Sequence, residues 1–572
     1  MMQPFRAVAV DYDGTLTLGK HPEPDVLAAL VEARGAGMKV VLVTGRMMPS
    51  LRADFPELED YFDAVVAENG AMLWFNQADE RLLSTPVPDE LAAALRAREV
   101  PVDRGQVLLA TSAAYDAIAL QEIARLGLDC QLVRNREALM ILPAGVSKGS
   151  GLFEALGDLG VSYHNAIGIG DAENDHPLLE GCEIGVAVAN AISALKKHAD
   201  VVLAEPNGAG IAAFLRRVIL EGAIDVVPNR WRVSVGTRPD GAAATVAASR
   251  INVLIAGGSG TGKSYLAGLF AERLIRMGYS ACVFDPEGDH TNLGRLRGVV
   301  TVGGRDGLPT PKGLARLLEH RFGSIVVDLS LLRPDERTIY AGEALIFLQE
   351  HRAATGLPHW IFVDEAHAAL GVEGPAVDAF DPSQKGFCLV TFHPTELCQK
   401  ALRSADVLFL LPESEETTRD LLTYADWIGG PKVEHLMTRL GEMRRGQALL
   451  ITPARQDDAQ VVTLNARMSP HVRHWHKYVH GYFAPRNHFQ FRTPEGPTGR
   501  YAANVEDFHR ELRLASDDAL RHHAGRGDFS RWIAEVVRDS ELSWEVRMFE
   551  AEGDLEVMRD SLVRVIERRY GE

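Results

Sequence analysis

The middle of the chain carries a glycine-rich stretch whose residue types suit phosphate binding. It runs Gly257-Gly258-Ser259-Gly260-Thr261-Gly262-Lys263-Ser264 and fits the pattern G-x-x-x-x-G-K-[ST] without a mismatch. In this pattern backbone N–H groups curl around phosphate oxygens, and the start of the following helix adds the positive end of its dipole. Lys263 would reach the β- and γ-phosphates, and the Ser264 hydroxyl would hold Mg²⁺. We therefore expect the chain to bind ATP together with Mg²⁺.

Paired carboxylates near the N-terminus form a second candidate site. Asp11 and Asp13 follow the short apolar run 7–10 and precede a glycine and a threonine. Carboxylates at this spacing suit an aspartyl nucleophile with a neighbouring acid/base. The pair alone is weak evidence, because D-x-D-G also occurs in calcium loops. Three later stretches strengthen it: Thr44-Gly45-Arg46 after the apolar run 39–43, Lys148 before a predicted helix over 152–159, and Gly170–Asp175 after the apolar run 166–169.

Buried strands must bring these four stretches together. In open parallel sheets, functional residues lie beyond the C-terminal ends of the strands, so all four are expected at one sheet edge. A phosphate dianion can approach paired carboxylates only where a divalent cation and a lysine offset the repulsion. If the ligand is a phosphate, Lys148 and a divalent cation would supply that charge.

The order D-x-D-G-T-L, T-G-R, K, G-D-x-x-N-D resembles the Cof-type, sugar-phosphatase-like branch of the haloacid dehalogenase (HAD) superfamily. The segment around Asn69-Gly70 matches as well, and the resemblance covers about residues 5–220. It implies that Asp11 attacks phosphorus to form an aspartyl-phosphate, and that Asp13 protonates the leaving group and then activates water. The remaining implied roles are phosphoryl binding by Thr44 and Lys148, and Mg²⁺ binding by Asp11, the Asp13 backbone carbonyl, Asp171 and Asp175.

An inserted cap over about residues 73–143 would select a phosphorylated small-molecule substrate. Within it Trp74, Arg134 and Arg136 could contact substrate, although surface or packing roles are favoured. A HAD-like fold kept only as a binding module is the alternative; every motif residue is nevertheless present.

Acidic residues after two later apolar runs complete the nucleotide site. The run 280–284 ends in Asp285-Pro286-Glu287-Gly288-Asp289, and the run 359–363 ends in Asp364-Glu365. Asp364 is placed to order Mg²⁺, and Glu365 to polarise the attacking water. Thr391, after the run 386–390, is the expected sensor of the γ-phosphate, with His393 as the second choice.

These motifs, with a β hairpin before the glycine-rich loop (strand 230–236, turn Asp240-Gly241), resemble the HerA/FtsK superfamily of ring-forming ATPases over about residues 228–465. The resemblance implies a hexamer with ATP between neighbours and an arginine finger in trans; Arg403, Arg419, Arg444 and Arg445 are candidates. Members commonly move DNA or protein through the ring. The net charge of −18 gives nucleic acid no positive support. A bifunctional kinase–phosphatase and a nucleotide-gated assembly protein with a HAD-like sensor remain the alternatives.

Length and composition indicate the number of domains and the kind of protein. A chain of 572 residues is too long to fold around a single hydrophobic core, and we expect domains at 1–220, 221–469 and 470–572. The expected fold is α/β: a Rossmann-like HAD core with an inserted cap, a RecA-like P-loop core and a small, mostly helical C-terminal domain. Five scattered cysteines, no apolar run of membrane-spanning length and no signal-peptide layout predict a cytoplasmic protein without membrane contact.

The C-terminal segment offers no clear chemistry. His471, His474, His476, His480 and His488 cluster, but their spacing fits no usual metal template, so packing or contact with a polyanion is favoured. Helices are predicted over 504–514, 516–522 and 528–538, the last with Asp528 or Ser530 as N-cap. We expect a docking or assembly module here.

Overall fold

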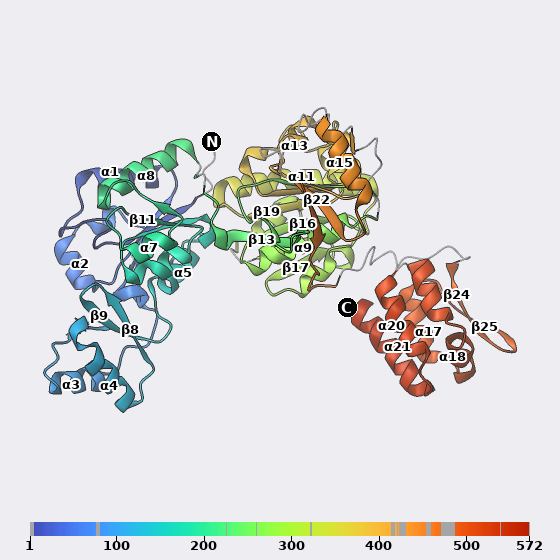
Figure 1. The fold of residues 1–572 in the computed structure, drawn as a ribbon, viewed down its shortest axis with the longest axis horizontal. Coiled ribbons are helices and arrows are strands. Elements are labelled where there is room, and N and C mark those ends of the chain that lie inside the picture. Colours follow the sequence, from blue (N-terminus) through green and yellow to red (C-terminus); the bar gives the residue numbers. More distant parts are fainter. Residues whose placement is uncertain are drawn as a thin grey trace.

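The computed structural model describes residues 5–570 except 76–79, 223, 225, 259, 321–322, 413–417, 420, 422–430, 453–458, 471–486 and 538. Three parts follow one another: an N-terminal domain with a cap below it, a central P-loop domain and a C-terminal domain beyond it (Figure 1). The α/β fold class expected from the sequence is confirmed. Among the described helices, none is long and apolar enough to cross a membrane.

An eight-stranded sheet forms the centre of the N-terminal domain, in the order β12-β11-β10-β1-β2-β3-β4-β5. The strands β12 to β3 of this order run parallel, and β4 and β5 are antiparallel additions. Helices α1 (Pro24–Gly35) and α8 (Asn207–Glu221) pack on each other, and α5 (Lys148–Asp158) packs near β3. The strands are β1 Ala7–Val10, β2 Lys39–Val43, β3 Ala64–Ala67, β4 Met72–Phe75, β5 Arg81–Leu82, β10 Ala166–Gly170, β11 Ile184–Ala187 and β12 Val201–Val202.

The cap has its own antiparallel sheet, in the order β6-β7-β9-β8. Its strands are β6 Asp103–Arg104, β7 Leu109–Ser112, β8 Cys130–Asn135 and β9 Ala138–Pro143. Helices α3 (Asp89–Ala97) and α4 (Asp116–Leu126) pack against each other and share a small apolar core with the sheet. The range 73–143 expected for the cap therefore includes β4 and β5, which extend the core sheet instead.

The P-loop domain is built on an eleven-stranded sheet, in the order β14-β13-β23-β22-β21-β15-β20-β19-β16-β18-β17. Strand β20 lies between β15, which precedes the P-loop, and β19, which precedes Asp364. The strands are β13 Arg232–Thr237, β14 Ala243–Ala247, β15 Val253–Ala256, β16 Ala281–Asp285, β17 Val299–Gly303, β18 Ser324–Asp328, β19 Trp360–Val363, β20 Phe387–Thr391, β21 Val407–Leu410, β22 Gln447–Ile451 and β23 Gln460–Leu464. Helix α9 (Lys263–Arg276) follows the P-loop, and α11 (Pro334–Thr355) packs its apolar side into the core.

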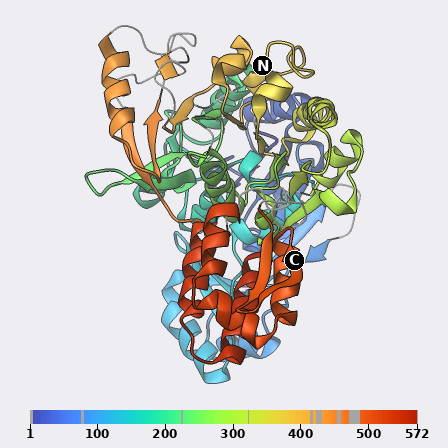
Figure 2. The same cartoon turned by 90° about the vertical axis from the view of Figure 1, so that its right-hand side faces the viewer.

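The predicted hairpin before the P-loop is present as β13 and β14, with Gly241 at φ 83° in its turn. Figure 2 shows this hairpin extending outward beside β22 and β23. It pairs with β23 and so belongs to the main sheet.

In the described part of the C-terminal domain, the ribbon β24 (Phe489–Thr493) and β25 (Gly496–Ala502) joins five α-helices and a π-helical turn (Ile533–Val537) around an aromatic core. The helices are α17 Val505–Leu514, α18 Asp517–Ala524, α19 Asp528–Trp532, α20 Ser540–Glu550 and α21 Leu555–Tyr570. Asn504 caps α17 as an acceptor for the Asp507 N–H. The N-cap prediction for α19 was wrong: Gly527, in a left-handed conformation at φ 65°, holds that position, because Asp528 instead pairs with His523.

The N-terminal and P-loop domains meet through the N-terminal edges of their sheets. Tyr163 Oη donates to the Met277 carbonyl (3.2 Å), and Tyr279 Oη donates to Glu183 Oε2 (2.8 Å). Tyr163 and Glu183 precede β10 and β11, and Tyr279 precedes β16. The candidate catalytic residues follow the opposite, C-terminal ends of the strands, so the two sites point away from each other across roughly two strand lengths, about 30 Å.

Candidate active sites

A buried lysine joins two of the predicted carboxylates in the N-terminal domain. Lys148 Nζ lies 2.5 Å from Asp11 Oδ1 and 2.6 Å from Asp175 Oδ1, and all three residues are buried. Asp175 Oδ2 accepts hydrogen bonds from the backbone N–H groups of Asp171 (2.8 Å) and Ala172 (2.9 Å). Asp175 therefore fixes the loop after β10, while Asp11 keeps Oδ2 without a donor among the described residues.

Charge in this cluster is incompletely balanced by the protein. Burial, and then the charge of Asp175, raise the pKa of Asp11 well above its ordinary value. Burial also raises the pKa of Asp171. Burial alone would lower the pKa of Lys148, but the charges of Asp11 and Asp175 raise it, and the net shift of this pKa is upward. Lys148 pairs with Asp11 and Asp175, and Arg136 of the cap pairs with Asp171, so three carboxylates face two cations. Such a set attracts further positive charge.

The same carboxylates can hold a divalent cation. One ligand oxygen each from Asp11, Asp171 and Asp175 lies within 4.8 Å of the others. Oxygen ligands of this kind are those that Mg²⁺ prefers. Gly14, at φ 83°, leaves the approach open, since a Cβ there would lie 2.4 Å from Asp171 Oδ2. The donor set therefore fits Mg²⁺.

Asp13 and Thr44 stand at the same edge of the sheet. Arg46 donates from Nε to Asp13 Oδ2 (2.7 Å) and from NH2 to Asp13 Oδ1 (2.6 Å), and it also contacts Asp54 Oδ2 at 2.7 Å. Thr44 is fully buried, and its hydroxyl accepts from the Arg46 N–H at 3.1 Å. Both Asp13 oxygens are thus engaged by one arginine, which must release Asp13 before that carboxyl can exchange a proton with a substrate.

The cap reaches into this site. Arg136, at φ 53° in the turn between β8 and β9, hydrogen-bonds Asp171 through NH2. Glu68 anchors the cap from the core, accepting from the backbone N–H groups of Gln106, Val107 and Leu108 at 2.7–3.0 Å. By contrast, Arg134 pairs with Asp116 at the cap surface. Arg136 is therefore a site residue that the sequence analysis ranked as surface or packing.

The glycine-rich loop folds as expected between β15 and α9. Gly257, Gly260 and Gly262 have φ values of 159°, 79° and 109°, of which the last two lie in the region that favours glycine. Lys263 Nζ donates to the Gly258 carbonyl at 2.9 Å, and Thr261 Oγ1 donates to the same carbonyl at 2.8 Å. Ser264 lies in the first turn of α9. Ser259 is outside the described residues.

Asp364 has a partner that the sequence analysis did not find. Its Oδ2 lies 3.1 Å from His290 Nε2, and its Oδ1 accepts from the Glu365 N–H at 2.9 Å. The neighbouring carboxylate of Asp285 accepts from the backbone N–H groups of Asp289 (2.9 Å) and His290 (2.7 Å), which holds the loop after β16 in place. Burial lowers the pKa of His290, but Asp364 and Asp285 outweigh it and the net shift is upward. Burial raises the pKa of Asp285 to about 7.

Glu365 adopts a left-handed conformation, at φ 52° and ψ 44°. Its Oε2 is buried without a hydrogen-bond partner among the described residues. Burial, and then the charge of Asp364, raise the pKa of Glu365 to about 8. A non-glycine residue held in this conformation is a known sign of a functional position.

Thr391 lies at the end of β20, between the P-loop strand and the Asp364 strand. Its hydroxyl is within 3.1 Å of His367 Nδ1 and accepts from the His393 N–H at 3.0 Å. His367 in turn lies 3.5 Å from Glu365 Oε2. His367 Nδ1 thus hydrogen-bonds Thr391 and also faces the carboxylate of Glu365.

A histidine group in the C-terminal domain is a poorer metal candidate. His522, His523 and Asp528 offer ligand atoms within 4.8 Å of one another. His523, however, uses Nδ1 for Asp528 (2.9 Å) and Nε2 to accept from the Arg492 N–H (2.8 Å). Of the predicted histidine cluster, His488 stacks on Tyr501, and 471, 474, 476 and 480 lie outside the described residues.

Comparison with known proteins assigns both domains. Residues 8–96 and 116–215 match the family of haloacid dehalogenase-like hydrolases. Residues 249–352 match the central domain of helicase HerA. The chain belongs to the haloacid dehalogenase-like hydrolases through its N-terminal domain and carries a HerA-type domain behind it, which confirms both resemblances.

Relatives of the N-terminal domain match this chain over almost their whole length. A phosphoglycolate phosphatase of Methanothermobacter thermautotrophicus is 32% identical over 220 residues, covering 37% of this chain and 98% of the relative. That of Archaeoglobus fulgidus is 31% identical over 221 residues, covering 37% and 96%. A solved haloacid dehalogenase-like hydrolase from Bacillus subtilis is 20% identical with a TM-score of 0.33, covering 37% of this chain and 100% of that one.

Proposed function

We propose that the chain is a two-activity hydrolase, with a Mg²⁺-dependent phosphomonoesterase in the N-terminal domain and an ATPase in the HerA-type domain. The observation that carries the first activity is the buried set of Asp11, Lys148, Asp171 and Asp175. The second rests on the convergence of Lys263, Asp364, Glu365 and Thr391 at one sheet edge.

The phosphatase reaction follows from the groups around Asp11. Asp11 Oδ2 attacks phosphorus, the bond to the ester oxygen breaks, and Asp13 gives its proton to the leaving alkoxide. Asp13 then takes a proton from the water that cleaves the aspartyl-phosphate, which restores both carboxyl groups. Lys148 and Thr44 hold phosphoryl oxygens. Mg²⁺ held by Asp11, Asp171, Asp175 and the Asp13 carbonyl would offset the charge of the approaching phosphate.

The substrate of this site is a small phosphomonoester that the cap can cover. Its relatives are named as phosphoglycolate phosphatases, so phosphoglycolate is the first substrate to test. Arg136 supports this class, because its guanidinium lies beside Asp171, where a second anionic group of the substrate would arrive. A substrate would take over the contact that Arg136 now makes with Asp171.

The ATPase reaction places the nucleotide phosphates on the P-loop, with Lys263 leaving the Gly258 carbonyl to reach them. Asp364 and Ser264 would hold Mg²⁺ there. Glu365 Oε2, which is buried without a hydrogen bond and lies 3.5 Å from His367 Nδ1, accepts the proton of the attacking water. Thr391, whose hydroxyl contacts the same His367, senses the γ-phosphate. A base in this position favours transfer to water, which sets the ATPase apart from the kinase alternative.

Assembly into a hexameric ring, with ATP between neighbours, fits the HerA-type domain. Such a ring could move or remodel a polymer, and we expect it in the cytoplasm. The net charge of −18 makes nucleic acid the less supported cargo. The particle mass with and without ATP tests this part: six copies support it, and a monomer in both states refutes it.

One variant separates the two activities. Lys263→Ala should lose ATP hydrolysis and keep phosphoglycolate hydrolysis, and chelation of Mg²⁺ should stop both. Transfer of the γ-phosphate to an acceptor hydroxyl, instead of its release, would establish the kinase–phosphatase alternative. Wild-type protein that hydrolyses neither compound with Mg²⁺ would leave the nucleotide-gated assembly protein.

A further inference from the structure

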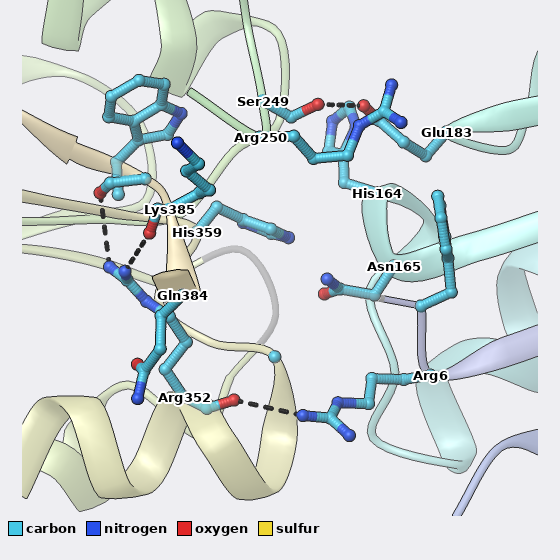
Figure 3. Close-up of a pocket in the computed structure, with 14 residues that line it drawn as sticks. Arg6, His164, Asn165, Glu183, Ser249, Arg250, Arg352, His359, Gln384 and Lys385 are labelled. Carbon is cyan, nitrogen blue, oxygen red and sulfur yellow. Dashed lines mark hydrogen bonds and ion pairs between the residues drawn. The ribbon is translucent and has the colours of Figure 1, made fainter. Parts of the chain in front are cut away.

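A small cavity lies where the two domains meet, away from both catalytic edges. Its volume is about 60 Å³, and residues of both domains line it. Arg6, His164 and Asn165 approach from the N-terminal domain, while His359, Gln384 and Arg352 approach from the P-loop domain (Figure 3). A space of this size holds a few waters or one small oxyanion.

Three arginines of the lining form no ion pair with a carboxylate of the described residues. Arg352 donates to the carbonyls of Pro358 (2.8 Å), Lys385 (2.5 Å) and Gly386 (3.4 Å). Arg250 donates through NH1 and NH2 to two further carbonyls, of Ile224 and Val226. Arg6 donates to the Ala353 carbonyl at 2.5 Å. Carbonyl oxygens satisfy these guanidinium donors without cancelling their charge.

Of the described residues, Glu183 is the one carboxylate that lines the cavity, and it already has several donors. Glu183 Oε2 lies 2.8 Å from His164 Nδ1 and accepts from Tyr279 Oη, and Glu183 Oε1 accepts from Ser249. Lys385, a fourth cation of the lining, pairs with Asp406 at 2.7 Å. Three arginines against one carboxylate leave an excess of positive charge in a partly desolvated space. Burial lowers the pKa of Arg352 to about 9 and also lowers that of Arg6.

Hydrogen-bond donors around the cavity are left over as well. His359 Nδ1 accepts from the Ser280 N–H at 2.9 Å, so the neutral ring carries its proton on Nε2. Burial holds the pKa of His359 well below its ordinary value, which keeps the ring neutral. Within the described part of the chain, His359 Nε2, Arg6 Nε and Arg250 Nε are buried N–H groups without an acceptor. Gln384 Oε1 of the same lining is a buried acceptor without a hydrogen bond among the described residues, but it is neutral and the three donors outnumber it. Because unmet buried donors are costly, a further acceptor is expected here.

We propose that this interdomain cavity is a binding site for a small oxyanion of the size and charge of inorganic phosphate, held by Arg6, Arg250 and His359. The anion accepts from N–H groups of both domains at once and therefore fixes one domain against the other. It is a site distinct from the two catalytic centres, which lie at the far ends of the strands, and it does not depend on either activity. The oxyanion is either free phosphate or the phosphoryl end of a small ester.

Hydrogen exchange of the full chain locates the binding. Inorganic phosphate, compared with chloride at equal ionic strength, should slow exchange around 164–166, 250–252 and 384–387. Phosphoglycolate in a parallel titration distinguishes the sources: protection at lower concentration than with phosphate assigns the ester. Protection of the P-loop by phosphate serves as an internal reference. No protection of the interdomain segments with either compound overturns the proposal.

Variants at the cavity make the test specific. In His359→Asn the side-chain oxygen can still accept from the Ser280 N–H, while the Nε2 donor is gone; Arg6→Gln removes one charge. Each should raise the phosphate concentration needed for interdomain protection by about 10-fold to 100-fold, the range for hydrogen bonds to a charged group. Arg230→Gln is the matched control, since Arg230 binds Asp200 and the Cys182 carbonyl across the same interface but does not line the cavity.

Protection in Arg230→Gln should stay within about twofold of wild type. Equal losses in all three variants would mean that the interface, and not an anion, is being measured, and would overturn the proposal. Unfolding temperatures in chloride check that each variant is folded. Unchanged protection in both His359→Asn and Arg6→Gln would also contradict it.

Discussion

Removing the Lys148 ammonium should destabilise the N-terminal domain strongly. Lys148 is fully buried and lies within 2.6 Å of two carboxylates. Lys148→Met keeps most of the side-chain volume but leaves Asp11 and Asp175 beside each other without their cation. Loss of one partner of a buried ion pair costs about 3–5 kcal/mol. In a domain of this size that lowers the unfolding temperature by about 6–20 °C.

A second lysine of the same domain provides the control. Lys39 pairs with Asp63 at 3.4 Å, and its side chain is 45% exposed. Exposed pairs contribute about 0–1 kcal/mol, so Lys39→Met should shift the unfolding temperature by only a few degrees. Calorimetry of both full-length variants in EDTA makes the comparison.

Mg²⁺ should reverse much of the loss in Lys148→Met. A ligand at a hundred times its Kd stabilises a protein by about 2.7 kcal/mol. In the variant, Asp11 and Asp175 have lost their ammonium partner, so they should attract Mg²⁺ more strongly than in wild type. The Mg²⁺-dependent rise in unfolding temperature should thus be larger in Lys148→Met than in wild type. A loss no greater than that of Lys39→Met, or a variant that Mg²⁺ does not stabilise, would refute this account of the cluster.

Three further changes address the reactions. Glu365→Gln should abolish ATP hydrolysis while nucleotide affinity and phosphatase activity stay near wild type, as measured by phosphate release and nucleotide titration. Because His290 orients Asp364, His290→Ala should raise the Mg²⁺ concentration needed for half-maximal ATPase activity by about 10-fold to 100-fold; an unchanged Mg²⁺ requirement would argue against that role. Arg136→Ala should lower kcat/KM for phosphoglycolate by about 10-fold to 100-fold without changing ATPase activity, since hydrogen bonds to charged groups contribute about 1.5–3 kcal/mol; the surface mutation Arg134→Ala is its control.

The sequence predicted the residues that follow strands. Asp11, Thr44 and Asp171 each stand directly after an apolar run that became β1, β2 or β10, so their meeting at one edge follows from parallel topology. Asp364, directly after β19, was found for the same reason, whereas Lys263 was found from the G-x-x-x-x-G-K-[ST] pattern of the loop. A residue directly after a strand has little backbone freedom, so the strand itself determines where its side chain lies.

Contacts between distant segments could not be predicted in this way. Arg136 reaches Asp171 only because the cap folds over the core, and His290 meets Asp364 from 74 residues away. The D-P-E-G-D run did mark the His290 region, and a histidine directly after it is the one signal that could have been used. The excess of cations at the interdomain cavity could not be predicted from any sequence pattern, since Arg6, Arg250 and His359 come from separate segments.

Acid-quenched protein gives the most direct test of the central claim, which is that Asp11 is the nucleophile of a working phosphatase. Wild-type protein mixed with phosphoglycolate and Mg²⁺, quenched within one turnover, should carry one phosphoryl group on the peptide that contains Asp11. Glu365→Gln should carry the same group, and Asp11→Asn should carry none and release no phosphate from the ester. Turnover by wild-type protein without the adduct, or an adduct that persists in Asp11→Asn, would contradict the account.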